Sequence, residues 1–142
     1  MKSKINDIKK TDLRIGNLIG IKETALHADG CNHSEAIFEI EEIKKDVVQF
    51  KGYHANEYYK DLKPIPLTEQ WLLDFGFKDK RDFYEKGKLS ISSANLKDYY
   101  PNGRVYYNSW AIVESQPKYV HQLQNLYFAL AQEELILKER TL

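Results

Sequence analysis

The chain has 142 residues, which is the size of one domain or of two very small modules that share a core. Hydrophobic residues make up 42% and charged residues 30%, as in soluble globular proteins, and no apolar run reaches the ~20 residues that a membrane-spanning helix needs. Lys and Arg together number 21, as do Asp and Glu, so no net charge draws the chain to nucleic acid or to an anionic membrane.

The start of the chain, MKSKINDIKK, is basic and polar and lacks the apolar segment of a secretory signal. The only cysteine, Cys31, cannot build an internal disulfide framework. Both features predict a cytoplasmic protein. Residues 1–11 show no sustained hydrophobic period and are predicted to be a loose lead-in.

Residues 12–66 are predicted to form a small SH3-like β-barrel. LRIGNLIGI alternates apolar and polar residues around a bend at Gly16 and Asn17, and AIFEIEEI and DVVQFKGY are two further strands joined by a tight turn at residues 44–46. EYYKDLKPIPL is a last extended piece that two prolines end. Such barrels are binding or spacing modules more often than enzymes, although a fold alone does not determine a function.

Residues 67–137 are predicted to form a helix, a small antiparallel sheet and a C-terminal helix that share a core with the barrel, giving an α+β fold. PLTEQWLLDFGF begins a helix with Thr68 as its cap and Gly76 at its end. DFYEKGKLSISS, RVYYNSW and AIVESQ are rich in β-branched and aromatic residues, which favours strands. In PKYVHQLQNLYFALAQEEL, apolar residues recur every three or four positions, so one broad stripe of this helix suits a core or a homo-oligomer interface.

The same helix carries an unusual polar face. His121 and Asn125 are four residues apart and share this face, with Gln122 and Gln124 on either side. Amides and a neutral imidazole both donate and accept hydrogen bonds, so this surface could bind a planar base, a ribose or a partner's backbone. The alternative is that these groups fasten strands and loops inside the fold.

A second candidate surface is KDYYPNGRVYY, which interleaves basic residues with tyrosines. This pattern can stack a base and neutralise a phosphate, although ordinary packing of tyrosines in a hairpin explains it as well. For a nucleotide ligand, the candidate residues for stacking and phosphate contact are Arg104, Tyr106 and Tyr107, and those for base or ribose contact are His121, Gln122 and Asn125.

The loop LHADGCNHSE places zinc-type ligands at alternating positions, namely His27, Asp29, Cys31 and His33. Structural zinc sites usually pair two cysteines at short spacing, so no metal and no cofactor are predicted, and these four residues are only weak candidates. No glycine-rich phosphate loop is present, and Cys31 and His33 are paired only by sequence proximity. No catalytic residue is predicted, and an enzyme is the less favoured class.

Three segments, DLRIGNLI, LKPIPLTEQWLLDFGF and KYVHQLQNLYFALAQEEL, resemble a family of small, functionally uncharacterised phage and prophage proteins of Bacteroides-like bacteria. The resemblance implies a mobile-element accessory protein acting inside the bacterial host cell, but no established activity. Small phage proteins of this kind often act by binding. We therefore predict a non-catalytic counter-defence protein that sequesters a nucleotide-derived immune signal. One alternative is a protein-interaction module that inhibits a host defence protein directly, and another is a metal-dependent hydrolase.

Overall fold

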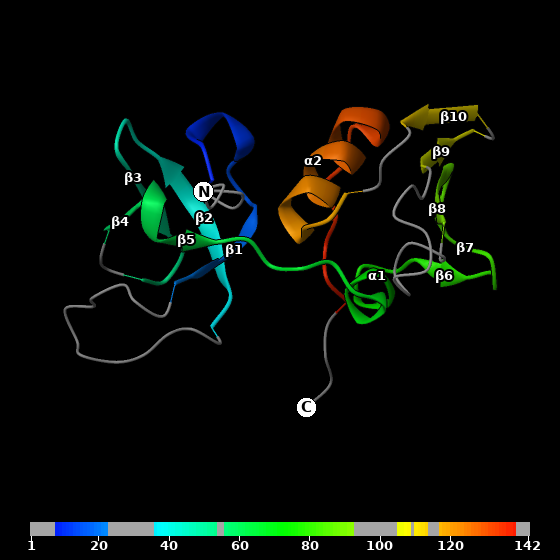
Figure 1. Ribbon diagram of the computed structural model, residues 1–142, viewed down its shortest axis with the longest axis horizontal. Coiled ribbons are helices and arrows are strands. Elements are labelled where there is room, and N and C mark those ends of the chain that lie inside the picture. Colours follow the sequence, from blue (N-terminus) through cyan, green and yellow to red (C-terminus); the bar gives the residue numbers. More distant parts are fainter. Residues whose placement is uncertain are drawn as a thin grey trace, which may run out of the picture. The chain divides into compact units, whose positions relative to one another are not determined.

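The computed structural model describes residues 8–22, 36–53, 56–92, 105–108, 110–113 and 117–138 (Figure 1). The predicted α+β class is confirmed: a barrel-like antiparallel sheet, a short helix, a second small antiparallel sheet and a C-terminal helix. The chain divides into two compact units. Unit 1 consists of Met1–Ile65 and Tyr119–Asn125, and unit 2 consists of Pro66–Lys118 and Leu126–Leu142. In the described part of the chain, no helix has the length and apolarity to span a membrane.

Unit 1 is built on a five-stranded antiparallel sheet that curls into a nearly closed barrel. The order of the strands is β4-β3-β2-β1-β5, so the first strand lies between the second and the last. Its elements are η1 (Lys10–Asp12), β1 (Leu18–Ile21), β2 (Phe38–Ile43), β3 (Val47–Phe50), β4 (Asn56–Tyr58), η2 (Tyr59–Asp61) and β5 (Leu62–Lys63), where η denotes a 3-10 helix.

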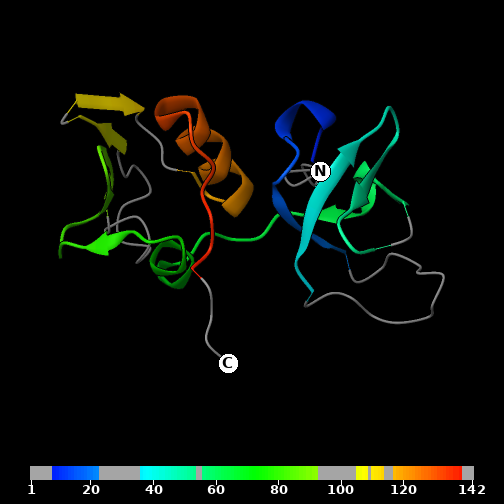
Figure 2. The same cartoon turned by 180° about the vertical axis from the view of Figure 1, so that it is seen from behind.

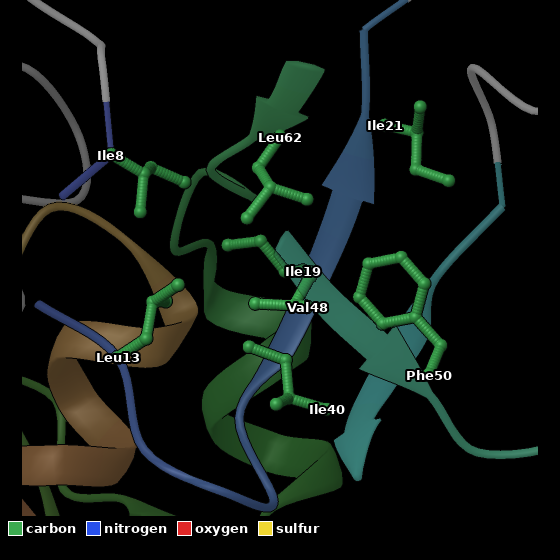
Figure 3. Close-up of a cluster of buried hydrophobic side chains, with 8 residues drawn as sticks. All are labelled: Ile8, Leu13, Ile19, Ile21, Ile40, Val48, Phe50 and Leu62. Atoms are coloured by element: carbon green, nitrogen blue, oxygen red, sulfur yellow. The ribbon is translucent and has the colours of Figure 1, made fainter. Parts of the chain in front are cut away.

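The core of unit 1 follows the alternation of the strands. In β3, Val48 and Phe50 are buried while Val47 and Gln49 are partly exposed, as period-two side-chain alternation requires. Figure 3 shows the side chains of the buried cluster, which comes from the strands and from the segment before β1. Its members are Ile8, Leu13, Ile19, Ile21, Ile40, Val48, Phe50 and Leu62. Ile8 is therefore a core residue, although it lies in the predicted lead-in.

The first predicted strand is shorter than its sequence pattern indicates. The expected bend is present, because Gly16 adopts a φ of +94°, which a residue with a Cβ rarely takes. Before this bend the chain forms η1 rather than a strand, and Leu13 is buried whereas Ile15 is exposed. Strand pairing starts only at Leu18, which lies opposite Glu39.

Unit 2 contains a second antiparallel sheet, in the order β10-β9-β8-β7-β6, which Figure 2 shows from behind. Helix α1 begins as predicted, because the Thr68 side chain accepts a hydrogen bond from the Trp71 backbone N–H. The elements are α1 (Glu69–Asp74), β6 (Lys78–Asp79), β7 (Phe83–Lys86), β8 (Leu89–Ser92), β9 (Val105–Tyr107) and β10 (Trp110–Val113).

The C-terminal helix α2 (Val120–Ala131) supplies residues to both units. Up to Asn125 it belongs to unit 1, and from Leu126 onward to unit 2. Val120, Leu123 and Tyr127 are buried, which is the three- and four-residue spacing of the predicted apolar stripe. A core shared by the two predicted modules stays a prediction.

Two isoleucines close together in the sequence test this description of the core. Ile40 is 0% exposed and Ile37 is 50% exposed. We expect Ile40→Ala to lower the free energy of unfolding by about 2–5 kcal/mol, because it removes buried methyl groups and leaves a cavity. The matched variant Ile37→Ala should lower it by about 1 kcal/mol or less. Urea denaturation followed by circular dichroism measures both, and equal losses would contradict the burial of Ile40.

Candidate functional site

The polar residues of α2 in unit 1 hold an irregular stretch of chain, residues 12–18. Gln124 is 2% exposed. Its side-chain Oε1 accepts a hydrogen bond from the Leu18 backbone N–H at 2.8 Å, and its Nε2 donates to the Gly16 carbonyl at 3.1 Å. A glutamine suits this position because one amide both accepts and donates.

Asn125 binds the same stretch from the neighbouring position of the helix. Its Oδ1 accepts hydrogen bonds from Asn17 Nδ2 at 2.8 Å and from Arg14 Nη1 at 3.2 Å. Its Nδ2 donates to the Asp12 carbonyl at 3.0 Å. The side chains of Asn17, Gln124 and Asn125, referred to below as the amide clasp, thus connect residues that are far apart in the sequence.

Asn17 is completely buried, and its backbone and side-chain groups have partners. Its side-chain Oδ1 accepts from the Arg14 backbone N–H at 2.7 Å. Its backbone N–H donates to the Arg14 carbonyl, and its carbonyl accepts from the Ile40 N–H. Burial of so polar a residue is tolerated because its donors and acceptors are paired.

Two of the predicted ligand-binding residues on α2 therefore make contacts within the protein. Asn125 belongs to the amide clasp, and the Oε1 of the exposed Gln122 accepts from the Tyr119 backbone N–H at 3.2 Å, at the start of the helix. Hydrogen bonds of this kind are expected if the polar residues of α2 fasten strands and loops inside the fold. The assignment of both residues to a ligand stays a prediction.

His121, the third predicted residue on α2, is only 3% exposed, and its ring lies parallel to that of Tyr119 at a centroid distance of 6.1 Å. Among the described residues, its Nδ1 has no hydrogen-bond partner. Burial lowers the pKa of His121 below its ordinary value of 6.5, and the Asp12 carboxylate opposes this shift less strongly. The imidazole is thus held neutral at physiological pH.

The other predicted residues lie in unit 2. Tyr106 and Tyr107 are consecutive residues of β9, so their side chains point to opposite faces of the sheet. Tyr106 pairs with Ser90 and Ala111, whereas Tyr107 pairs with Leu89 and Trp110. The structure thus does not bring the two tyrosines onto one stacking surface. Arg104 lies outside the described residues.

Trp110, which was not predicted as a site residue, is the most exposed large hydrophobic residue of the described chain, at 77%. It ends a row of directly paired residues that runs across the sheet from Lys86 through Leu89 and Tyr107. Paired residues share one face of a sheet. Leu89 is 1% exposed and Tyr107 is half-buried, so from Leu89 to Trp110 the row becomes progressively more exposed. We call Tyr107 and Trp110 the aromatic edge.

Two turns meet beside the aromatic edge. The Asn108 backbone N–H, next to Tyr107, donates to the Lys88 carbonyl at 2.8 Å, and Lys88 is exposed. Tyr107 is itself fixed, because its hydroxyl donates to the Leu130 carbonyl of α2 at 3.2 Å. A positioned tyrosine, an exposed tryptophan and a nearby lysine are therefore gathered at one end of the sheet.

The weak metal candidates His27, Asp29, Cys31 and His33 lie outside the described residues. Within the described ranges, no group of three or more His, Cys, Asp or Glu side chains is arranged to hold a metal ion. Comparisons with protein-family profiles, with curated protein sequences and with solved structures find no match for this chain.

The amide clasp predicts different effects for two glutamines of α2 that are two positions apart, Gln122 and Gln124. We expect Gln124→Leu to lower the free energy of unfolding by about 1–3 kcal/mol, because the Leu18 N–H and the Gly16 carbonyl lose their partner. The control Gln122→Leu removes an exposed contact at the start of the helix and should cost under about 1 kcal/mol. Urea denaturation compares them, and similar small losses from both would exclude a stabilising role for the clasp.

Proposed function

We propose that this chain is a non-catalytic binding protein that captures a nucleotide-type ligand on the aromatic edge of unit 2. The observation that carries the proposal is the 77% exposure of Trp110 directly across from Tyr107. Tryptophan has a large flat apolar surface, and leaving it in water is unfavourable. A planar base that stacks on the indole removes this surface from water and gains about 1–3 kcal/mol.

Charge near the aromatic edge supports a ligand that carries a phosphate. Lys88 is exposed, and its backbone is hydrogen-bonded to Asn108 beside the edge. Lys86 is a weaker candidate for the phosphate because its ammonium donates to the Phe75 carbonyl at 2.8 Å and lies 5.9 Å from the Tyr127 ring centroid. The chain has no net charge, so attraction of an anion depends on such local cations.

Arg104 adds to this proposal from the sequence alone. It stands immediately before Val105, the first residue of β9, and its guanidinium would bind a phosphate in bidentate fashion. We propose Lys88 and Arg104 as the phosphate contacts and the aromatic edge as the base contact. The proposed site on unit 2 does not include the polar groups on α2.

The biological role that we propose is sequestration. A protein that binds a nucleotide-derived immune signal lowers the free concentration of that signal without turning it over. The resemblance of three segments to small phage and prophage proteins supports a place in counter-defence, and it does so by analogy.

Direct inhibition of a host defence protein is the second candidate, and the same surface supports it. Tryptophan is among the residues that dominate binding energy at protein interfaces. Trp110 lies on β10, the last strand of the described sheet, where an extended segment of a partner could pair.

The test is calorimetric titration of the full chain with a panel of cyclic and ADP-ribose-type nucleotides. We expect heat from one of them, and we expect Trp110→Ala to weaken that binding by about 5- to 150-fold, the equivalent of one lost stacking contact. Tyr58→Ala is the matched control, because Tyr58 is an exposed aromatic residue of unit 1 and its loss should leave the affinity unchanged.

The absence of heat from every nucleotide would reject the sequestration proposal. A pull-down from host lysate then distinguishes the second candidate. One stoichiometric partner that is retained by the wild type and lost by Trp110→Ala would support direct inhibition through β10. A partner retained equally by both proteins would reject the aromatic edge as the contact surface.

A further inference from the structure

His121 is a buried ionisable residue of unit 1 that is not part of the proposed ligand site. His121 is one helical turn before Asn125, on the same side of α2 as the amide clasp. It is 3% exposed, and its Nδ1 has no partner among the described residues. A buried ionisable ring with an unpaired nitrogen sits beside the hydrogen bonds that hold residues 12–18 to the helix.

Protonation of the imidazole ring changes the hydrogen bonds and the solvation that it needs. The neutral imidazole has one donor and one acceptor, whereas the imidazolium has two donors and a full positive charge. A charge that is buried without a strong partner costs much more than a buried neutral ring. The protonated side chain is therefore stable only if water or an anion reaches it.

The charged groups around His121 meet this requirement only in part. On the η1 side, the Asp12 carboxylate attracts the imidazolium, but its Oδ2 already accepts from the Lys9 backbone N–H at 2.9 Å. Beyond η1, the Arg14 guanidinium donates to the neighbouring Asn125 and supplies no negative charge to this part of the unit. The flanking chain contributes the Ile65 carbonyl, which accepts from the Val120 N–H.

The neighbours of His121 on α2 itself, Gln122, Gln124 and Asn125, are uncharged amides that carry the contacts already described. None of them offsets a positive charge. Burial outweighs the attraction of Asp12 and lowers the pKa of His121.

We propose that His121 is an acid-sensitive latch that couples the amide clasp to pH. The neutral imidazole keeps residues 12–18 against α2, and protonation opens this contact so that the ring becomes hydrated. The clasp is the part that gives way because side-chain hydrogen bonds hold it, whereas β1, β2 and β3 are joined by backbone ladders. Acid would thereby separate the start of the barrel from the helix without dissolving its sheet.

The direction of the pH dependence follows from linkage. The pKa of His121 is lower in the folded protein than its ordinary 6.5, so between these two values the open state binds more protons. The stabilisation of the closed clasp is fully present above about 6.5 and is lost as the pH falls from 6.5 through the lowered folded pKa.

Amide hydrogen exchange of the full chain between pH 7.5 and pH 5.0, corrected for intrinsic rates, tests the latch. The reporter is the Leu18 N–H, which donates to Gln124, and the reference is the Phe77 N–H of unit 2, which donates to the Leu72 carbonyl. Relative to the reference, we expect the protection of Leu18 to fall in acid by up to about tenfold for each unit by which the pKa is lowered. In His121→Leu and His121→Gln this acid loss should disappear.

A proton NMR titration of the wild type provides a test that needs no variant. The His121 ring should titrate below 6.5, with the remaining histidines of the chain as internal references. Titration at or above 6.5 would overturn the proposal. An acid loss at Leu18 that is as large in both variants as in the wild type would overturn it too.

Discussion

The arrangement of unit 1 depends on side-chain amides that pair with the backbone of an irregular segment. Residues 12–18 contain the end of η1 and a bend before β1, so regular helix or strand pairing does not satisfy all of their peptide groups. Gln124 and Asn125 provide an acceptor or a donor as each group requires. Because an unpaired buried peptide group costs about 1–3 kcal/mol, this pairing stabilises the segment against α2.

This requirement explains the unusual polar face of α2. Lysine offers donors only and an ionised glutamate offers acceptors only, so neither could replace Gln124, which makes one contact of each kind. Charged side chains would also carry a desolvation penalty at a position that is almost fully buried. The same burial keeps His121 neutral and makes its protonation a natural point of sensitivity in this part of the protein.

The two candidate surfaces differ in their chemistry. The polar groups on α2 already contact protein atoms, so a ligand there would compete with existing hydrogen bonds. At the aromatic edge, Trp110 presents apolar area to water, and a ligand would gain from covering it. This contrast is the physical reason for placing the proposed binding site on unit 2. The proposed ligand site and the proposed latch do not depend on each other, because they use different residues.

The sequence by itself determined the elements that depend on local period and local caps. Alternation in β3, the Thr68 cap of α1 and the apolar stripe of α2 are properties of neighbouring residues, and together they led to the α+β class. They also singled out Tyr107 and His121 as residues of interest. Such patterns do not predict the residue at which β1 begins. The alternation of Leu13 and Ile15 does not reveal that η1 precedes the bend.

Only the tertiary structure decided what those residues contact. Asn17 and Asn125 are 108 positions apart, so no local pattern could pair them. The exposure of Trp110 depends on its place in the last strand of the sheet, and the opposite orientations of Tyr106 and Tyr107 depend on strand register. Contacts of this kind arise when distant segments pack together, whereas the periodicity of a sequence reports only which face of each segment avoids water.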